Sequence, residues 1–457
     1  NISIDGNVDK VSITDQKKKF ESFGWQVLEV DGHNEIDIKN AIDSSKEETN
    51  KPSLIIAKST IGKFAPNKQN TSSIHGAPLG NEEMKLFFDE IGWEGDPFDH
   101  SDDVYDYFAE KRLEDNKSFE KWKSNLDNKL KNDGSFKKLW EQFEKNELSF
   151  PESFEIQEAA TRVTGGNYLK LIGLENKFVL GGSADLAAST KQIISEESYT
   201  SENRHGQNIE FGIREHSMAA VVNGISLHSN LFSFGSTFLV FSDYMRPSIR
   251  LASLMNLNSA YIFTHDSIYL GEDGPTHQPV EHLMSLRLIP GLDVIRPSNS
   301  IETIYAYKYL FSNTKNPKVL SLTRQNLKFL DYDVDYSDFL NGGFIISKGE
   351  DLTIFASGSE VNLALEIKET LKEYSVQVVS VPILNKLTPK ISESLNNNKL
   401  TFTIELGKAA GWSDYIGNIT ESFSVQTFGK SAPENDLAEF FKVNADSIGK
   451  KIRNYLG

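Results

Sequence analysis

The stretch Ala260-Tyr261-Ile262-Phe263-Thr264 is a short apolar run, and three polar residues, His265-Asp266-Ser267, follow it directly. An uninterrupted apolar run of this length is typical of an interior strand in a parallel sheet whose two faces are both covered. Two more runs have the same character, Lys177-Phe178-Val179-Leu180 and Lys318-Val319-Leu320-Ser321-Leu322. Because open parallel sheets place ligands beyond the carboxyl ends of their strands, we expect His265 to lie at a functional site.

The same alternation of strand and helix continues toward both ends of the chain. Apolar runs predict strands over residues 25–30 and 53–58, the second of them buried, with an amphipathic helix over 35–48 between them. Further strands are predicted over residues 352–355, 376–381 and 400–404, with a helix from Glu360. This rhythm predicts the α/β class, with three consecutive units that each contain a parallel sheet.

A charged segment separates the first of these units from the rest. Residues 101–150 mix acidic and basic side chains, and apolar residues recur among them at helical spacing, which predicts a surface helical connector with one packed face. The recurring residues are Phe119, Trp122, Leu126 and Leu130. The predicted bounds are 1–130 for the first domain with its connector, 131–150 for a linker, 151–335 for the second domain and 340–457 for the third.

Composition narrows the classes of function. The net charge of −17 argues against nucleic acid or an acidic membrane as a partner, and no apolar run approaches the roughly 18 residues of a membrane span. The absence of cysteine excludes disulfides and thiolate chemistry and is compatible with a reducing cytoplasm, where we expect the protein to act. The chain begins at Asn1 and runs straight into a predicted strand, so we expect that a preceding part of the first domain is missing.

An acidic residue marks the first candidate site. In Phe211-Gly212-Ile213-Arg214-Glu215-His216, Glu215 follows a predicted short strand and precedes an apolar helix. One interpretation is a glutamate favoured at a helix start by the helix dipole. The other is a carboxyl group in a cleft that passes a proton to a ring nitrogen of a ligand.

An aromatic strip follows. Phe238, Phe241 and Tyr244 are spaced so that they line one side of a predicted helix, a pattern that usually belongs to a core. Leu239 and Ile249 already supply a core face for this helix. A separate strip of aromatic rings could therefore hold a flat heterocycle by stacking.

The loop Gly271-Glu272-Asp273-Gly274-Pro275-Thr276-His277 presents an acid and a histidine on a rigid turn. With His265 nearby at a strand end, it predicts a ligand site. Arg324 ends a predicted strand and Arg162 opens the second domain. On so acidic a chain, these arginines are candidates for bidentate phosphate contacts, with a surface salt bridge as the alternative for each.

Taken together, these segments resemble the transketolase family, and the resemblance covers essentially the whole chain. The matching segments, in the family's order, are Ile74-His75-Gly76-Ala77-Pro78-Leu79-Gly80, Gly181-Gly182-Ser183-Ala184-Asp185-Leu186, Gly212-Ile213-Arg214-Glu215-His216, Ser236-Thr237-Phe238, His265-Asp266-Ser267, residues 271–281, Ser321-Leu322-Thr323-Arg324-Gln325-Asn326-Leu327 and Thr427-Phe428-Gly429-Lys430-Ser431-Ala432-Pro433. The resemblance makes the three predicted domains a diphosphate-binding domain, a pyrimidine-binding domain and a C-terminal transketolase domain.

The resemblance implies transfer of a two-carbon ketol unit from a ketose phosphate of the xylulose 5-phosphate type to an aldose phosphate, through the carbanion of thiamine diphosphate. On the cofactor side it implies that Glu215 protonates the aminopyrimidine and that the aromatic strip packs against this ring. Asp185 is implied as a further cofactor-binding residue.

On the substrate side, the resemblance implies that His277 and His75 move protons on the substrate oxygens and that Asp273 binds a substrate hydroxyl. The residues implied for the sugar phosphate are Arg162, Ser189, His265 and Arg324, and His75 is also implied as a substrate contact. The family's active site lies between two subunits, which implies a homodimer.

One departure from the family concerns the metal ion. The chain contains no Gly-Asp-Gly, the motif that holds the divalent metal and through it the diphosphate. Ile2 is expected to offer a backbone carbonyl to the metal, and Asn1 is either the metal-binding asparagine or its neighbour. We therefore expect Mg²⁺, or Ca²⁺ or Mn²⁺ in its place, and thiamine diphosphate to bind weakly or not at all.

Other interpretations stay open. The chain could be a non-catalytic fragment or a split subunit that keeps the dimer and substrate surfaces. Dihydroxyacetone synthase is poorly separated from transketolase by sequence. Deoxyxylulose-phosphate synthase shares a similar Asp-Gly-Pro-Thr-His stretch, but it lacks the surrounding sequence and this domain order.

Overall fold

The computed structural model of the chain describes residues 1–330, 332, 334–396 and 398–457. It forms two compact units, Asn1–Asn125 and Leu126–Gly457. Among the described residues, no helix combines the length and the apolar character that crossing a membrane requires.

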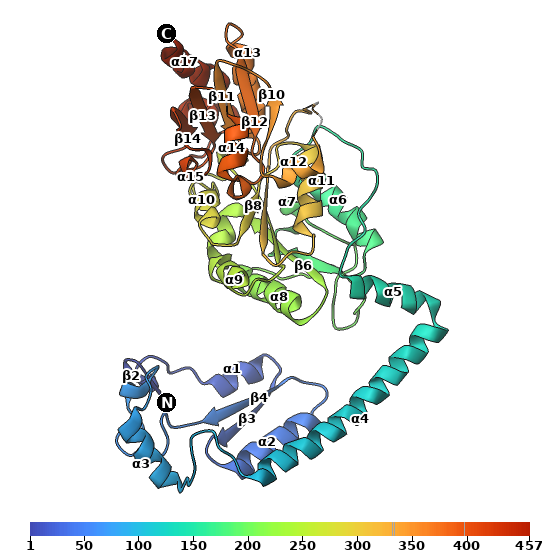
Figure 1. Cartoon of the computed structure of the whole chain (residues 1–457), viewed down its shortest axis with the longest axis vertical. Coiled ribbons are helices and arrows are strands. Elements are labelled where there is room, and N and C mark those ends of the chain that lie inside the picture. Colours follow the sequence, from blue (N-terminus) through green and yellow to red (C-terminus); the bar gives the residue numbers. More distant parts are fainter. Residues whose placement is uncertain (331, 333, 397) are drawn as a thin grey trace. The chain divides into compact units, whose positions relative to one another are not determined.

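The first unit contains two small sheets. Its elements are β1 (Ile2–Ser3), β2 (Gly6–Asn7), α1 (Gln16–Ser22), β3 (Gln26–Asp31), α2 (Glu35–Glu47), β4 (Ser53–Lys58) and α3 (Asn81–Ile91). β1 and β2 are antiparallel, whereas β3 and β4 are parallel, with α2 as the crossover between them (Figure 1). The Asn34 side chain caps α2 by accepting from the backbone N–H groups of Ile36 and Asp37.

The two predicted strands and the helix between them are confirmed, but the prediction that β4 is buried is wrong. Its residues are half-buried or exposed. The sheet that β4 forms with β3 has two strands among the described residues, so it does not enclose β4 as an interior strand.

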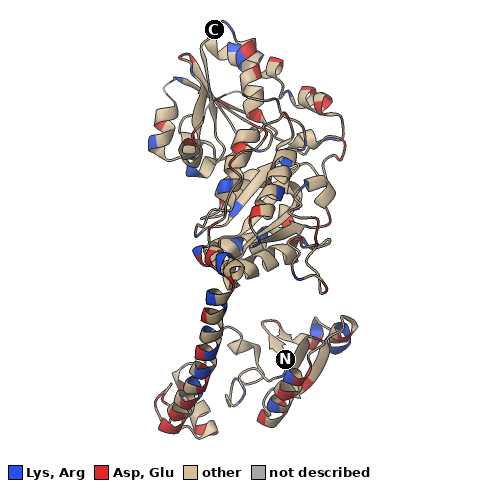
Figure 2. Ribbon diagram, turned by 90° about the vertical axis from the view of Figure 1, so that its right-hand side faces the viewer, with Lys and Arg blue, Asp and Glu red and all other residues tan. Residues whose placement is uncertain are grey.

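The charged segment forms two helices, α4 (Asp102–Asn132) and α5 (Gly134–Lys145). Figure 2 shows acidic and basic residues mixed along α4. The predicted packed face is present only in part: Phe119 is 53% exposed and Trp122 is 52% exposed, whereas Leu126 and Leu130 are half-buried, and α4 has no fully buried residue. The boundary between the two compact units falls inside α4.

The second unit begins with a parallel sheet in the order β5-β6-β7-β9-β8. Its strands are β5 (Val179–Ser183), β6 (Phe232–Phe238), β7 (Ala260–Thr264), β8 (Asp293–Ile295) and β9 (Lys318–Leu322). Every residue of β6, β7 and β9 is buried. The apolar runs predict this for β7 and β9, whereas β6 was not among the predicted strands. In the register, Thr264 pairs with Phe238 on one side and with Leu322 on the other. The segments that follow these three strands therefore leave the sheet at the same edge.

Helices cover both faces of this sheet. They are α6 (Thr161–Glu175), α7 (Ala187–Thr190), α8 (Glu215–His228), α9 (Ser242–Leu254), α10 (His282–Arg287) and α11 (Ser300–Leu310). Ile262 faces a core with α6 and α11, whereas its neighbours Tyr261 and Phe263 face a core with α8 and α9. This alternation along β7 is the period of two that a strand imposes.

The second unit contains a further sheet, with its strands in the order β10-β12-β11-β13-β14 (Figure 1). The elements of this part are α12 (Tyr336–Leu340), β10 (Phe344–Ser347), β11 (Leu352–Ala356), α13 (Glu360–Thr370), β12 (Val376–Ser380), α14 (Pro389–Leu395), β13 (Leu400–Glu405), α15 (Ser413–Ile416), β14 (Glu421–Ser424), α16 (Glu434–Phe441) and α17 (Ala445–Leu456). β10 is antiparallel and the other pairs are parallel. The predicted α/β class is confirmed, with β10 as an antiparallel edge.

A buried charge network joins the two sheets of the second unit. The Arg296 guanidinium donates to Asp266 Oδ2 at 2.9 Å and forms an ion pair with Glu360 at 2.8 Å. Nearby, Arg287 donates to both carboxylate oxygens of Glu405 at 2.8 and 2.9 Å. The side chains of all five residues are almost fully buried, so each charge depends on its partners to offset the cost of leaving water. Because Asp266 directly follows His265, the network also holds the end of β7 in place.

Candidate active site

Several of the predicted site residues surround one cavity of about 530 Å³. It lies at the carboxyl edge of the β5-β6-β7-β9-β8 sheet. Its lining consists of Ala184, Asp185, Leu186, Ile213, Glu215, Phe238, Phe241, Tyr244 and His277. These residues come from the segments after β5 and β6, from the start of α8 and from the loop after η4 (Ile268–Leu270). The cavity therefore lies where open parallel sheets place their ligands.

Glu215 is the first residue of α8, where the helix dipole favours a carboxylate. The predicted short strand before it is wrong, because residues 209–214 form a loop after an isolated bridge at Asn208. Glu215 is half-buried and makes no hydrogen bond or ion pair with any other described residue. Its carboxyl group is therefore free to contact a ligand in the cavity.

The aromatic strip exists, but not on one helix. Phe238 ends β6, Phe241 ends the single turn η3 (Leu239–Phe241), and Tyr244 lies in the first turn of α9. The prediction of one helix is wrong because the apolar core holds the chain in a strand up to Phe238. The three rings still follow one another: Phe238 and Phe241 have centroids 5.8 Å apart and planes 8° apart, and Phe241 and Tyr244 have centroids 6.1 Å apart.

His277 joins this aromatic wall edge-on. Its ring centroid lies 5.6 Å from that of Phe241, with the planes at 72°. Its Nδ1 is 2.8 Å from Thr276 Oγ1. The loop that carries it turns through Gly271 and Gly274, both with positive φ, where glycine avoids a steric cost. The loop therefore turns at its two glycines and places its histidine in the cavity lining.

Gln278, which the sequence did not single out, anchors this loop. Its buried side-chain amide donates to the backbone carbonyls of Ile268 at 3.0 Å, Gly271 at 3.1 Å and Lys430 at 2.9 Å. Ser431 also donates through Oγ to the Glu272 carbonyl at 2.5 Å. The segment around Lys430 thus braces the loop that carries His277, a long-range contact for which the sequence carries no signal.

The predicted phosphate residues also come together. Arg162 Nη1 donates to the Ser189 carbonyl at 2.5 Å and lies 3.4 Å from His265 Nε2. The imidazole of His265 stacks on Phe238, with centroids 3.7 Å apart. Burial, with the positive charges of Arg162 and Arg324 next, lowers the pKa of His265 from 6.5 to about 3. His265 is therefore neutral near neutral pH and leaves the positive charge of this group to the arginines.

Three of the predicted site residues are exposed to solvent. Arg324 is exposed, two residues beyond β9, and burial, with the charge of Arg324 next, lowers the pKa of Arg162. Asp185, with a positive φ of 59°, is exposed and lines the cavity. Asp273 is exposed at the tip of its loop and is not part of the cavity lining. The structure thus does not bring Asp273 to the aromatic wall.

The remaining predicted residues belong to the first unit and are described within it alone. His75 is exposed and follows the single turn η2 (Ser72–Ile74). Asn1 accepts through Oδ1 from the Ile61 N–H at 3.0 Å and donates through Nδ2 to Asn70 at 2.5 Å. Ile2 is half-buried on β1.

Three domain families match consecutive parts of the chain. Residues 1–148 match the family described as "Transketolase, thiamine diphosphate binding domain", residues 157–329 match "Transketolase, pyrimidine binding domain", and residues 342–444 match "Transketolase-like TK C-terminal domain". The transketolase of Bacillus subtilis is 37% identical over 99% of this chain and 71% of its own length. The chain belongs to the transketolase family.

Solved transketolase structures agree with this assignment. The enzyme of Leishmania mexicana is 30% identical, with a TM-score of 0.93 over 99% of this chain and 69% of its own. The enzyme of Pichia stipitis, in a complex with sedoheptulose 7-phosphate, is 29% identical with a TM-score of 0.93 over 98% of this chain and 70% of its own. The predicted family is confirmed: the chain has the function of a transketolase, a transferase, and two of its matching domain families indicate thiamine diphosphate as the cofactor.

Proposed function

We propose that this chain transfers a two-carbon ketol unit between sugar phosphates and that the cavity beside Glu215 receives the pyrimidine ring of thiamine diphosphate. The observation that carries this proposal is the pairing of an unpartnered carboxyl group with an aromatic wall in one cavity. A flat, basic heterocycle needs both: a surface for stacking and a group that shares a proton with a ring nitrogen.

The residues of this chain fit that ring. Ala184, Leu186 and Ile213 line the cavity together with the aromatic strip, so the walls are largely apolar. Glu215 is the one glutamate of the lining, and no described residue competes for its carboxyl group. When bound, thiamine diphosphate supplies the nucleophilic carbon and the electron sink for carbon–carbon bond cleavage. Glu215 then holds a proton at the ring nitrogen, and Phe238, Phe241 and Tyr244 orient the ring and exclude water.

The substrate side follows from the group around Arg162. We propose that Arg162 and Arg324 bind the phosphate of the sugar, because guanidinium groups donate two parallel hydrogen bonds to phosphate oxygens. His265 is neutral and adds no charge, so its part is to position Arg162, to which its Nε2 is adjacent. Ser189 completes this group through its contact with Arg162.

Proton transfer on the substrate oxygens is proposed for His277, which lies in the cavity lining. We propose His75 as a second proton carrier, Asp273 as the partner of a substrate hydroxyl and Asp185 as a further cofactor contact. The family assignment supports these roles through the segments that carry these residues. The structure of the Pichia stipitis relative with sedoheptulose 7-phosphate supports sugar phosphates as the substrate class. We further propose a homodimer and a cytoplasmic location.

The residues proposed for a divalent metal do not form a complete site. The Asn1 side chain uses both of its polar atoms on Ile61 and Asn70, which leaves the Ile2 carbonyl as the remaining candidate. Among the described residues, the cluster of three metal-ligating side chains that comes close enough for one ion is Asp243, Glu281 and His282, in the other unit. We therefore propose that Mg²⁺, Ca²⁺ and Mn²⁺ bind this chain weakly. Calorimetric titration that yields micromolar affinity for any of them would overturn this.

A coupled assay with xylulose 5-phosphate as donor and ribose 5-phosphate as acceptor tests the function. We expect turnover that requires thiamine diphosphate and is lost in Glu215→Gln, a change that keeps the shape and removes the acid. Glu175→Gln is the matched control, since Glu175 is an exposed glutamate of α6 outside the cavity. No transfer by the wild-type chain at saturating cofactor would contradict the proposal. Preference for formaldehyde as acceptor would assign dihydroxyacetone synthase activity in its place.

A further inference from the structure

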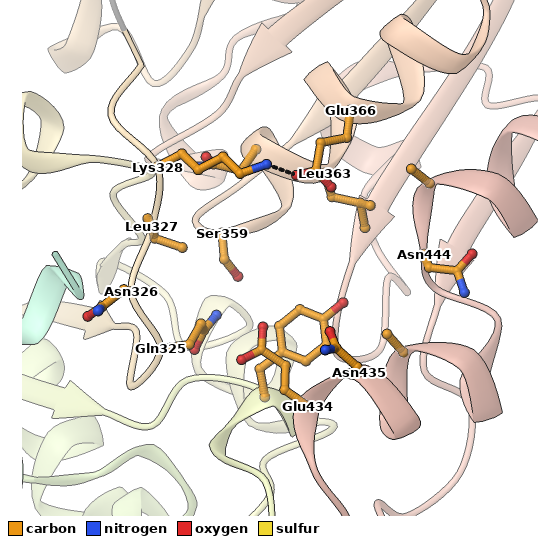
Figure 3. A pocket seen from close by; sticks show the side chains of 14 residues that line it. Gln325, Asn326, Leu327, Lys328, Ser359, Leu363, Glu366, Glu434, Asn435 and Asn444 are labelled. Atoms are coloured by element: carbon orange, nitrogen blue, oxygen red, sulfur yellow. Dashed lines mark hydrogen bonds and ion pairs between the residues drawn. The ribbon is translucent and has the colours of Figure 1, made fainter. Parts of the chain in front are cut away.

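A second pocket, of about 280 Å³, lies between the segment after β9 and the helices α13, α16 and α17. Its walls come from residues 325–328, from the start of α13, from α16 and from the start of α17 (Figure 3). It shares no lining residue with the cavity beside Glu215. Its volume lies just below the range that is usual for small-molecule sites, about 300 to 1,000 Å³.

Gln325 is the polar group at the base of this pocket. It is 7% exposed, and neither Nε2 nor Oε1 of its amide has a hydrogen-bond partner among the described residues. Figure 3 shows the amide pointing into the same space as the hydroxyl of Ser359 and the carboxyl group of Glu434. A buried amide without partners is costly, so this side chain is set to contact whatever occupies the pocket.

Two more residues of the lining have side-chain oxygen atoms without a partner among the described residues, Asn362 and Glu434. Asn362 donates through Nδ2 to the Ser298 carbonyl at 3.3 Å, but its Oδ1 is buried and unpartnered among the described residues. Glu434 forms no hydrogen bond or ion pair with any described residue. Burial raises the pKa of Glu434, against the opposing effect of Arg324. Because the amides of Asn326 and Asn435 also belong to the lining, the pocket offers both acceptor oxygens and N–H donors.

The charges in the lining of the pocket disfavour an anionic ligand. Its lysine, Lys328, is already bound to Glu366, with Nζ and Oε1 2.6 Å apart. The remaining charged group, Glu434, is acidic. A phosphate would meet this carboxyl group and would leave the acceptor oxygens of Gln325 and Asn362 unpaired, because a phosphate dianion brings no donor.

We propose that this pocket binds a neutral, hydroxyl-rich small molecule, an unphosphorylated sugar or polyol. A hydroxyl group both donates and accepts, so two neighbouring hydroxyls satisfy both ends of the Gln325 amide and also reach Glu434. An ammonium ion offers donors alone and leaves the Gln325 N–H group unpaired. The proposal goes beyond the ketol transfer proposed above and depends on neither cofactor nor turnover.

Ribitol is a suitable probe, because it has no carbonyl group and no phosphate and is therefore not a ketol donor or acceptor. Its binding to the full chain is measured by saturation-transfer NMR and calorimetry, with 1,4-diaminobutane and inorganic phosphate as the cationic and anionic comparisons. We expect saturable binding of ribitol and none of the other two. Gln325→Met, which keeps the length of the side chain and removes both polar ends, should weaken binding about tenfold or more.

Glu434→Gln should weaken ribitol binding less, because an amide still accepts one hydrogen bond. Asp436→Asn is the matched control: Asp436 lies in the first turn of the same helix, is exposed and is outside the pocket lining, so ribitol affinity should not change. Circular dichroism confirms that each variant is folded. Absence of saturable ribitol binding, undiminished binding by folded Gln325→Met, or tighter binding of the diamine or of phosphate would each overturn the proposal. A failed transferase assay would leave these binding results unaffected.

Discussion

Arg162 Nη1 lies 3.4 Å from Nε2 of His265, so a permanent positive charge sits against an imidazole ring. A guanidinium group has only N–H donors, which makes Nε2 the acceptor and places the ring proton on Nδ1. From Nδ1 the ring donates to Thr264 Oγ1, 2.8 Å away. Burial and this arrangement together explain why the pKa of His265 is lowered to about 3.

This lowered pKa makes the stability of the fold sensitive to acid. The unfolded chain binds a proton at His265 below pH 6.5, whereas the folded chain does so only near pH 3, so the free energy of unfolding falls as pH drops through this window. Between pH 6.5 and pH 5 the loss from this residue is about 2 kcal/mol. Urea unfolding at pH 7.5 and 5.0 should show that His265→Gln loses less stability than the wild type over this interval. Equal losses would contradict the explanation.

Removal of the neighbouring charge should raise the pKa of His265. In Arg162→Met the repulsion of the imidazolium by the guanidinium disappears, but burial, the larger cause, stays. The pKa should therefore increase and still remain below 6.5. NMR titration of the imidazole resonances measures it directly, with Arg250→Met as a control because Arg250 is an exposed arginine of α9. An unchanged pKa in Arg162→Met would show that the two side chains are not coupled.

The network around Arg296 should be a major contributor to stability. Arg296→Met leaves the carboxyl groups of Asp266 and Glu360 buried without their cation, so we expect a loss of about 3 to 5 kcal/mol in the free energy of unfolding. Urea unfolding measures it. The matched control is Arg453→Met, which removes an exposed ion pair with Glu373 and a hydrogen bond to the Thr370 carbonyl and should cost much less stability. Similar losses in both variants would argue against the role of burial.

Local composition predicted β7, β9 and the central strands β11, β12 and β13, because interior strands are apolar on both faces, but it did not identify β6 as a strand. The run 260–264 is β7, and the polar residues after it lie at the sheet edge as expected. The aromatic strip was misplaced for a related reason. Spacing of three residues suits a helix, but the burial of β6 holds Phe238 in a strand, and only the turn η3 separates the strand from α9.

Long-range contacts were beyond the reach of the sequence. Nothing in the residues near His277 indicates that Gln278 binds the Lys430 carbonyl, 152 positions away. The sequence also gives no sign of the ion pair between Arg296 and Glu360. Arg296 follows a strand of one sheet and Glu360 follows a strand of the other. Such contacts depend on the packing of whole sheets, whereas local patterns report only the nearest turn or two of the chain.

Gly182, near the end of β5, is the position where the sheet tolerates a side chain least. A Cβ atom there would lie 1.9 Å from the Ile209 carbonyl oxygen, and because this oxygen belongs to the backbone, the segment that leads to Glu215 would have to shift. We expect Gly182→Ala to cost about 1 to 3 kcal/mol of unfolding free energy, as overpacked sites do. Gly134→Ala is the control, since Gly134 begins α5 with no atom within 4 Å of a new Cβ, and alanine there should stabilise by about 0.4 to 1 kcal/mol through the unfolded chain. Thermal unfolding of the two variants separates these effects: a Gly182→Ala variant as stable as the wild type would mean that β5 and residues 207–211 are less tightly packed than the contact with Ile209 requires.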